Sequence, residues 1–271
     1  MNRTRGWKYK SFLRYLRFFK YISFSPKRGS FLEYYYVLMR YLDDIVDGDA
    51  PLPYGYISES EYIKEKIAFT ENMTSPKDEV DQLILYCFKL AEQFGQEFYE
   101  ETSDILNSLL FDADRRGKHQ IFTSQVLYAH FHQLDIRGTI KATLKIFKED
   151  PEKFEILESL GTACRYHYDL EDFNEDIAAG YINIPKEEMD ELDISLNDIL
   201  FNNSSKIDLW LYKHAMEGME LLKKHEEILP SGKFGWLARA TFPPVYKWPA
   251  QKVFQRTISR IDKTKSISDR P

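Results

Sequence analysis

Apolar residues recur along nearly the whole chain at the three- and four-residue spacing of amphipathic helices. This spacing predicts helices over residues 7–22, 30–47, 58–71, 78–94, 100–116, 124–148, 151–179, 205–228 and 245–262. Ser75–Pro76 and Asp150–Pro151 resemble helix starts, with an N-cap side chain followed by proline, and Gly180 is suited to end a helix. No strand pair or short repeat interrupts the pattern. The sequence therefore predicts an all-α fold, a single-domain helical bundle over 1–271.

Composition supports this fold class and restricts the setting of the protein. A hydrophobic fraction of 43% is ample for a core, and only 12 Gly and 11 Pro among 271 residues disfavour a many-turned β fold. Cys87 and Cys164 both lie within apolar helical patterns, and two lone cysteines do not make a disulfide framework. No apolar run reaches the roughly 18 residues that span a bilayer, and no signal-peptide core follows the start. We therefore expect a soluble, cytoplasmic protein.

The net charge of −6 hides a basic N-terminal segment. Residues 1–32 carry nine Lys and Arg and no acid, so the rest of the chain carries −15. The basic aromatic segment 1–29 could lie on an anionic membrane surface, meet a phosphorylated ligand, or include an ordinary first helix with a solvated basic face. A nucleic-acid partner is disfavoured, because the rest of the chain is acidic and no binding motif is present. At the other end, we expect a flexible tail over 263–271.

Two acidic clusters lie within the helical pattern. The stretch RYLDDIVDGDAP places Asp43, Asp44 and Asp47 on the last turns of a predicted helix, where like charges repel by roughly 0.2–0.5 kcal/mol per pair. The second stretch, LEDFNEDIAAGYINIP, contains Asp172 and Asp176, which are one helical turn apart, as Asp43 and Asp47 are. Two helices of this kind can direct both carboxylate pairs into one cavity of a bundle.

Carboxylates that face each other repel unless a cation lies between them, and Mg²⁺ is the natural candidate. Magnesium takes hard oxygen ligands and is usually held by a few carboxylates together with substrate phosphate oxygens. Di-iron bundles use Glu and a Glu-x-x-His pattern, which this sequence lacks, so iron is disfavoured. The alternative is that both clusters are solvated helix ends.

The two clusters resemble the aspartate-rich motifs of the squalene/phytoene synthase family. The segment SPKRGSFLEYYYVLMRYLDDIVD follows the family's order of proline, basic residue, tyrosine and arginine, and LGTAC followed by LEDFNEDIAAGYINIP resembles the second motif. The similarity extends from about Phe18 to Pro185 and more loosely to the C-terminus. It implies an all-α isoprenoid-synthase fold around a central cavity, in which two or three Mg²⁺ ions bind prenyl diphosphates such as farnesyl or geranylgeranyl diphosphate.

The resemblance also assigns roles by motif position. The expected metal ligands are Asp43, Asp44 and Asp47 on one side of the cavity and Asp172 and Asp176 on the other. Arg40 and Tyr36 would hold or position the diphosphate. Ionisation of an allylic diphosphate places negative charge on the leaving group, and divalent metal and guanidinium groups stabilise that charge. These residues are therefore the expected catalytic centre.

The second motif departs from the family pattern at several positions. The family usually has glutamine at Arg165 and asparagine at Tyr168, and the residues at Glu171, Tyr181 and Asn183 differ as well. Arg165 would bring a permanent cation suited to diphosphate oxygens, or would pair with Asp169 or Asp172 on its own helix. Asp169 could replace the lost asparagine as a metal ligand. We expect metal and diphosphate binding to be retained and the handling of the second substrate to be altered.

Three aromatic or imidazole side chains are further cavity candidates: Tyr168, Tyr128 and His132. The segment LDIRGTIKATLKIF resembles the family's glycine-containing helix, and the tyrosine expected about two turns earlier falls near His132. Tyr128 is the nearest tyrosine upstream. His132 and His167 could each be packed or partly exposed helix residues, or could act as a general base that quenches a cation by proton loss.

Our leading hypothesis is a Mg²⁺-dependent prenyltransferase that condenses two prenyl diphosphates. The alternatives are a terpene synthase that ionises and cyclises a single prenyl diphosphate, and a non-catalytic relative that binds prenyl diphosphates. Family members that reduce their coupled intermediate do not depend on a glycine-rich fingerprint, so its absence here leaves the use of NADPH open. Because products of this class are hydrophobic, the protein could associate peripherally with a membrane surface through its basic N-terminal segment.

Overall fold

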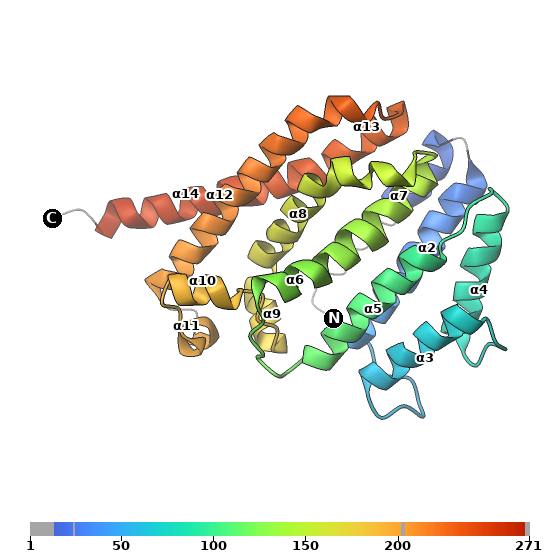
Figure 1. Ribbon diagram of the computed structural model, residues 1–271, viewed down its shortest axis with the longest axis horizontal. Coiled ribbons are helices and arrows are strands. Elements are labelled where there is room, and N and C mark those ends of the chain that lie inside the picture. The colour runs from blue at the N-terminus through green and yellow to red at the C-terminus, as the bar shows by residue number, and fades with distance from the viewer. Residues whose placement is uncertain (1–13, 24, 202–203, 269–271) are drawn as a thin grey trace. The chain divides into compact units, whose positions relative to one another are not determined.

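The computed structural model describes residues 14–23, 25–201 and 204–268, and these residues are mainly helical (Figure 1). Within these ranges there is no β-strand, and the single isolated bridge joins Gln120 to Tyr181. The predicted all-α fold is therefore confirmed. By its internal contacts the chain divides into two compact units, 1–114 with 142–148 and 115–141 with 149–271.

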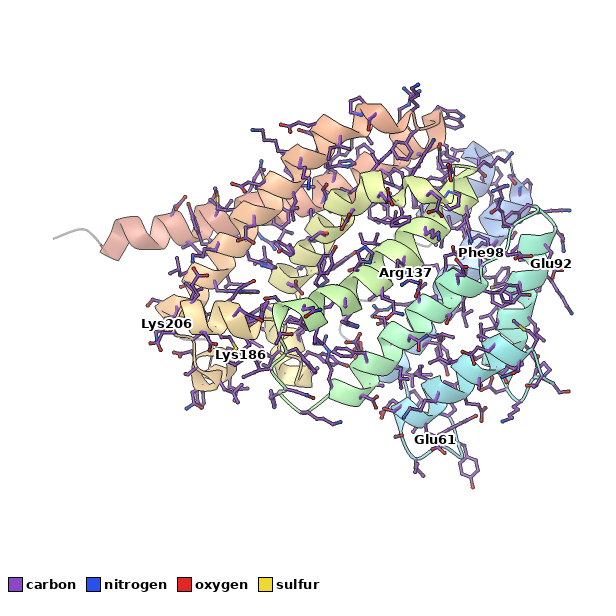
Figure 2. All side chains as sticks on the ribbon, in the orientation of Figure 1. Glu61, Glu92, Phe98, Arg137, Lys186 and Lys206 are labelled. Carbon is purple, nitrogen blue, oxygen red and sulfur yellow. The ribbon has the colours of Figure 1, made fainter. Side chains whose placement is uncertain are left out.

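The described part of the first unit contains a helix over 14–22 and five labelled helices (Figure 1). These helices are α2 (Pro26–Val46), α3 (Glu59–Asn72), α4 (Glu79–Glu92), α5 (Tyr99–Arg115) and α7 (Lys141–Phe147). The last residue of α5 and the first residue of α7 belong to the second unit. Helix α2 packs against α3 and α4. Phe98, which lies just before α5 (Figure 2), is fully buried, and its ring centroid lies 4.2 Å from that of Phe31. An aromatic core of this kind accounts for the fixed position of α2, on which the first acidic motif lies.

Two cationic side chains of this unit, Lys66 and Arg28, are buried, and each has polar partners. Lys66 is fully buried, and its Nζ lies 2.7 Å from Asp78 Oδ2 and 2.7 Å from Asp81 Oδ1. Arg28 donates to the carbonyl oxygens of Lys145 at 2.7 Å and Ile146 at 3.1 Å, both in the last turn of α7. Because a buried charge is costly unless it is paired, these contacts fix how the helices of this unit are held together.

The second unit contains the remaining labelled helices and four short 3₁₀ or π segments. They are α6 (Ser124–Phe131), a π segment (His132–Ile140), a 3₁₀ turn (Pro151–Lys153), α8 (Phe154–Glu171), α9 (Phe173–Ala179), α10 (Lys186–Glu191), α11 (Leu196–Phe201), α12 (Ser205–Ile228), a 3₁₀ turn (Leu229–Gly232), α13 (Trp236–Phe242), a π segment (Pro243–Lys247) and α14 (Trp248–Ser268). Helix α12 packs against α8 and α14 (Figure 1). At Gly218 the α12 backbone meets the Phe254 ring so closely that an added Cβ would lie 2.3 Å from it.

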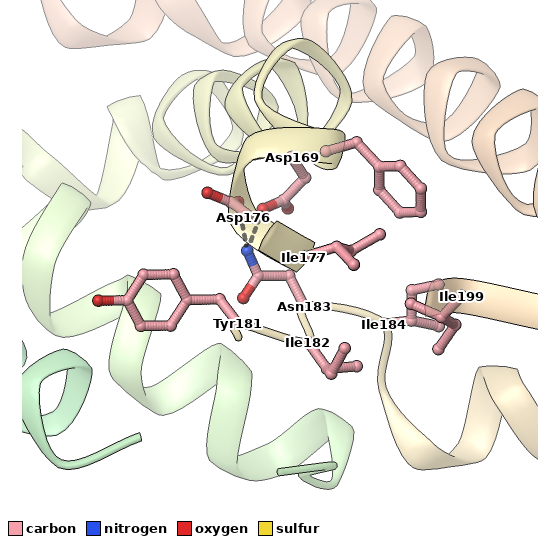
Figure 3. A pocket seen from close by; sticks show the side chains of 9 residues that line it. Asp169, Asp176, Ile177, Tyr181, Ile182, Asn183, Ile184 and Ile199 are labelled. Carbon is pink, nitrogen blue, oxygen red and sulfur yellow. Dashed lines mark hydrogen bonds between the residues drawn. The ribbon is translucent and has the colours of Figure 1, made fainter. Parts of the chain in front are cut away.

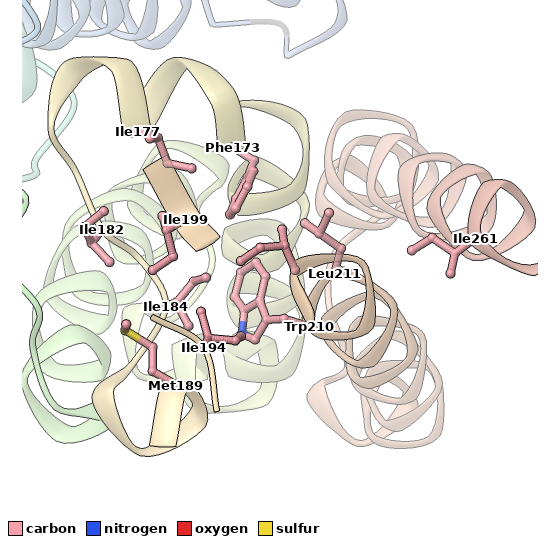
Figure 4. Close-up of a cluster of buried hydrophobic side chains, with 11 residues drawn as sticks. Phe173, Ile177, Ile182, Ile184, Met189, Ile194, Ile199, Trp210, Leu211 and Ile261 are labelled. Carbon is pink, nitrogen blue, oxygen red and sulfur yellow. The ribbon is translucent and has the colours of Figure 1, made fainter. Parts of the chain in front are cut away.

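A cluster of buried apolar side chains surrounds the segment after the second acidic motif (Figure 4). Trp210 of α12 lies at its centre and is 1% exposed, with Ile184 and Ile199 from the loop and helix that follow α9. Full burial of one such side chain contributes about 1.5–3 kcal/mol. The cluster therefore holds residues 177–199 against α12.

Most predicted helices are present, but several boundaries differ. Asp78, and not Ser75, caps α4, because its Oδ1 accepts the backbone N–H of Asp81 at 2.8 Å. The helix expected from Pro151 to Gly180 is divided at Asp172, and α2 begins at Pro26, directly after Ser25. The short helices α10 and α11 were not predicted, since each is too short to show a periodic pattern. Helix α14 continues to Ser268 beyond the expected start of the flexible tail, and residues 269–271, like 7–13 of the first predicted helix, lie outside the described residues.

Two further expectations concern the setting of the protein. Both cysteines, Cys87 and Cys164, are buried free thiols. Within the described ranges no helix combines the length and the apolar character required to cross a bilayer. Of the basic N-terminal segment, Arg17 and Lys20 pair with Glu33 at 2.9 and 2.7 Å, so part of its charge is balanced within the first unit.

Candidate functional site

The first acidic motif occupies the last turns of α2. Arg40 lies one turn before the aspartates, and its guanidinium spans two of them: Nη1 is 2.7 Å from Asp43 Oδ2 and Nη2 is 2.8 Å from Asp44 Oδ1. The i,i+3 and i,i+4 spacings place these groups on one face of the helix. Asp47 caps the helix, with its backbone N–H donated to the Asp43 carbonyl at 2.8 Å. The structure thus brings the predicted diphosphate-binding arginine together with two predicted metal ligands.

Carboxylates are crowded at this helix end. Burial and the neighbouring charge of Asp47 raise the pKa of Asp43 to about 8, although Arg40 acts to lower it. Asp112 of α5 adds to the same effect. Sequence analysis did not identify Asp112, because it lies 65 positions after Asp47 on a helix with no recognisable motif, and only the packing of the unit brings its charge close. Tyr36, one turn before Arg40, is close enough to act on the pKa of that arginine.

The second acidic motif begins at the break between α8 and α9. Asp172 has φ −102° and ψ 9°, donates its N–H to the Tyr168 carbonyl, and accepts the N–H of Asp176 at 2.8 Å. Helix α9 then ends at Gly180, whose φ of +87° is left-handed, as the sequence predicts for a terminating glycine. Backbone hydrogen bonds from Gly117 to Ala179 and from His119 to Gly180 join this turn to the loop after α5.

Asp169 is buried and both of its oxygens are engaged. Oδ1 accepts from Arg165 Nε at 2.9 Å and lies 2.8 Å from Nη2, and Oδ2 lies 3.4 Å from His214 Nε2. His214 is held between the rings of Tyr166 and Trp210, with centroid distances of 3.7 and 4.5 Å. Burial works to raise the pKa of Asp169, but Arg165 and His214 outweigh it and lower that pKa. Arg165 therefore pairs with Asp169 on its own helix, and its role in diphosphate binding stays a prediction.

Asn183 connects the two carboxylates of this cluster (Figure 3). Its Nδ2 donates to Asp176 Oδ2 at 2.9 Å and to Asp169 Oδ1 at 3.4 Å. Its Oδ1 accepts from Arg115 Nη1 at 2.9 Å. Burial raises the pKa of Asp176 to about 7, and Arg165 acts to lower it. Arg115, at the end of α5, is a buried cation that sequence analysis missed, because the pattern around it is that of an ordinary basic helix end.

The side chains differ in how well they fit a Mg²⁺ ion. Within the described ranges no three His, Cys, Asp or Glu side chains are arranged to hold a metal ion. Asp43, Asp44 and Asp47 supply the hard oxygen donors that Mg²⁺ prefers, and their crowding favours a cation. A metal ion at Asp169 would have to share this carboxylate with Arg165, whose Nε donates to Oδ1 at 2.9 Å, and with His214, whose Nε2 lies 3.4 Å from Oδ2. Magnesium binding therefore stays a prediction, with Asp43, Asp44 and Asp47 as its best-suited ligands.

The predicted cavity residues Tyr128, His132 and Tyr168 contact side chains outside the two acidic motifs. Tyr128 is 53% exposed, and its hydroxyl donates to Glu158 Oε1 at 2.6 Å, which raises the pKa of Tyr128 to about 12. His132 Nε2 is 4.0 Å from the same oxygen. Tyr168 is 44% exposed and stacks on His167 at 4.8 Å. Because the first motif and the second motif belong to different units, their convergence on one cavity also stays a prediction.

Solved structures that match this chain include two that cover most of it. The squalene synthase HpnC from Alicyclobacillus acidocaldarius has a TM-score of 0.61 and 13% sequence identity, over 90% of this chain and 85% of that one. A dehydrosqualene synthase solved in complex with a ligand has a TM-score of 0.56 and 14% identity, over 94% of this chain and 98% of that one. No protein-family model matches the sequence, and no curated protein matches it. The structural matches show that the chain has a divergent squalene/phytoene synthase-like fold.

Proposed function

We propose that this protein is a Mg²⁺-dependent prenyltransferase that condenses two prenyl diphosphates. Its fold, which squalene and dehydrosqualene synthases share, supports the use of prenyl diphosphate substrates. The observation that carries the proposal is the end of α2, where Arg40 spans Asp43 and Asp44 while Asp47 crowds the same turn. A cluster that combines a guanidinium with hard oxygen donors suits a diphosphate bound through a divalent cation.

Each residue of the first motif has a distinct part in this proposal. Asp43, Asp44 and Asp47 would hold Mg²⁺, which supplies Lewis-acid stabilisation of the departing diphosphate. The side chain of Arg40 is 32% exposed, so part of its guanidinium can reach a diphosphate oxygen while it remains anchored to the aspartates. Tyr36 lies one turn earlier on the same helix and would position the diphosphate beside Arg40.

The second motif would act on the same diphosphate through Asp172 and Asp176. Asp176 is held by Asn183, so its carboxylate has a defined direction, and Asp172 lies at the helix break, where its backbone conformation is not helical. If both motifs hold one diphosphate, replacement of Asp43 and of Asp176 should not be additive in its effect on turnover, because loss of either motif already removes the productive complex.

The proposal is tested by incubation of the full chain with Mg²⁺ and either farnesyl or geranylgeranyl diphosphate, followed by product mass. A doubled carbon skeleton supports condensation. An unchanged skeleton would identify a terpene synthase instead, and repetition with NADPH tests for a reductive second step. Diphosphate that is bound but never released would identify a non-catalytic relative.

Variants localise the chemistry. D43N/D47N and D172N/D176N should each abolish Mg²⁺-dependent diphosphate release without loss of helicity by circular dichroism. D190N is the matched control, because Asp190 is an exposed aspartate of α10 whose side chain pairs with the exposed Lys186. Unchanged turnover in both double variants would refute the mechanism.

A further inference from the structure

The second acidic motif contains its own cation. The Arg165 side chain is 16% exposed, and its guanidinium is bound to Asp169, which is 4% exposed. The carboxylates of Asp169, Asp135 and Asp176 all act on it and raise the pKa of Arg165 against the opposing effect of burial. A guanidinium in this position is permanently charged and cannot relieve the cluster by losing its proton.

The ring beneath Arg165 holds it in this place. Its guanidinium carbon lies 4.3 Å from the centroid of Phe131, at the end of α6, and 5.9 Å from that of Tyr168. His214 contacts the far oxygen of Asp169, so the carboxylate that anchors Arg165 is itself fixed from the other side. A cation held by two contacts with one carboxylate oxygen, by an aromatic face and by a positioned counter-ion has little freedom to move to a ligand.

Two departures from the family pattern, Arg165 and Asn183, thus supply N–H donors between the acidic side chains. Arg165 binds Asp169, and Asn183 bridges Asp169 and Asp176. The charges described as acting on Arg165 or Asp176 are four carboxylates and two guanidiniums, from Asp135, Asp169, Asp172, Asp176, Arg115 and Arg165. With every one of these groups ionised, the two guanidiniums offset half of the charge of the four carboxylates.

We propose that Arg165 is a built-in cation of the second acidic motif, which takes the place of one divalent metal ion and removes Asp169 from the metal ligands. This inference rests on the proposed function only in that the motif is taken to bind a divalent metal. In this arrangement the motif, through Asp172 and Asp176, takes no more than one ion. Arg165 serves the site as a positioning and charge-balancing residue, and it does not bind the diphosphate.

The test counts Mn²⁺ ions bound per full chain by electron paramagnetic resonance, with Mn²⁺ alone as the probe. R165Q introduces the residue usual in the family and should bind one more Mn²⁺ than the wild type. R165K keeps the charge and should bind the wild-type number. R165Q/D176N should lose the additional ion. A Mn²⁺ count and affinity in R165Q that equal those of the wild type would overturn the proposal.

A second variant avoids the instability that a buried, unpaired Asp169 could cause. R165Q/D169N removes both partners of the pair and keeps the formal charge of the cluster unchanged, so it should fold and bind the wild-type number of Mn²⁺ ions. Loss of an ion in this variant would show that Asp169 is a metal ligand and would overturn the proposal. So would weaker binding of inorganic pyrophosphate by R165Q at an unchanged Mn²⁺ count. If the expected Mn²⁺ counts hold but no prenyl diphosphate is turned over, the proposed function fails while this inference stands.

Discussion

Substitution of Gly180 by alanine tests how the second motif is held in shape. Gly180 has a φ of +87°, and a Cβ added there would lie 2.4 Å from Gly117 Cα and 2.5 Å from Gly117 N. Both contacts are with backbone atoms, so rotation of a side chain cannot relieve them. The hydrogen bonds from Gly117 to Ala179 at 2.9 Å and from His119 to Gly180 at 3.0 Å depend on the same close approach.

The magnitude follows from two separate costs. A left-handed conformation costs a residue with a Cβ roughly 1–2 kcal/mol. Overpacking against a rigid neighbour adds typically about 1–3 kcal/mol. G180A should therefore lower the free energy of unfolding by about 2–5 kcal/mol, a large part of the roughly 5–15 kcal/mol that holds a typical domain together.

Urea denaturation followed by circular dichroism measures this loss, and the matched control is G117A. Gly117 also has a left-handed φ, +72°, but a Cβ there meets nothing within 4 Å. G117A should therefore lower the free energy of unfolding only by the cost of the left-handed conformation, about 1–2 kcal/mol. An unfolding free energy for G180A equal to that of G117A would refute the argument that the two turns are in direct backbone contact.

Three further predictions concern the packing of each unit. K66M leaves the buried Asp81 without its cation, so the free energy of unfolding should fall by about 3–5 kcal/mol. K66M/D78N/D81N should recover part of this loss. Equal stability of K66M and the wild type in urea would contradict the prediction. Burial acts to raise the pKa of Asp78, but Lys66 lowers it below 3.8. The ionised Asp78 therefore contributes to folding stability above that pH, and this contribution is lost as the pH falls through the folded-state pKa. Acid titration of stability should therefore be less steep below about pH 4 in K66M than in the wild type, and identical curves would exclude this cause. W210F removes the N–H that Trp210 donates to Glu188 Oε2 at 2.6 Å. Burial already raises the pKa of Glu188, and loss of this hydrogen bond should raise it further, which NMR of the side-chain carboxyl group can measure. An unchanged pKa would mean that the hydrogen bond has no electrostatic effect.

Helix type and order could be predicted from the sequence because they depend on local periodicity. Asp150 caps the 3₁₀ turn that leads into α8, at the start that the sequence predicts, and Gly180 ends α9 as expected. The cap of α4 was misplaced because Ser75–Pro76 and Asp78 both offer a suitable side chain, and only the structure shows which oxygen accepts the Asp81 N–H. The break at Asp172 was missed for a related reason, since no glycine or proline marks it.

The candidate site was predictable to the extent that its residues lie close together in the sequence. The contacts of Arg40 with Asp43 and Asp44, and of Arg165 with Asp169, follow from i,i+3 and i,i+4 spacing on one helix. Asp112, Arg115 and His214 escaped notice, because each reaches its motif from a distant part of the chain.

The sequence by itself determined the all-α fold and the two acidic motifs, because helical periodicity and motif spacing are properties of neighbouring residues. The tertiary structure alone decided which charges balance the second motif. Asn183 reaches Asp169 and Asp176 across the turn at Gly180, and His214 reaches Asp169 from α12. The electrostatic energy of a charge in a poorly solvated interior depends on the groups that packing brings within a few ångströms of it. Separation along the chain does not predict which groups these are.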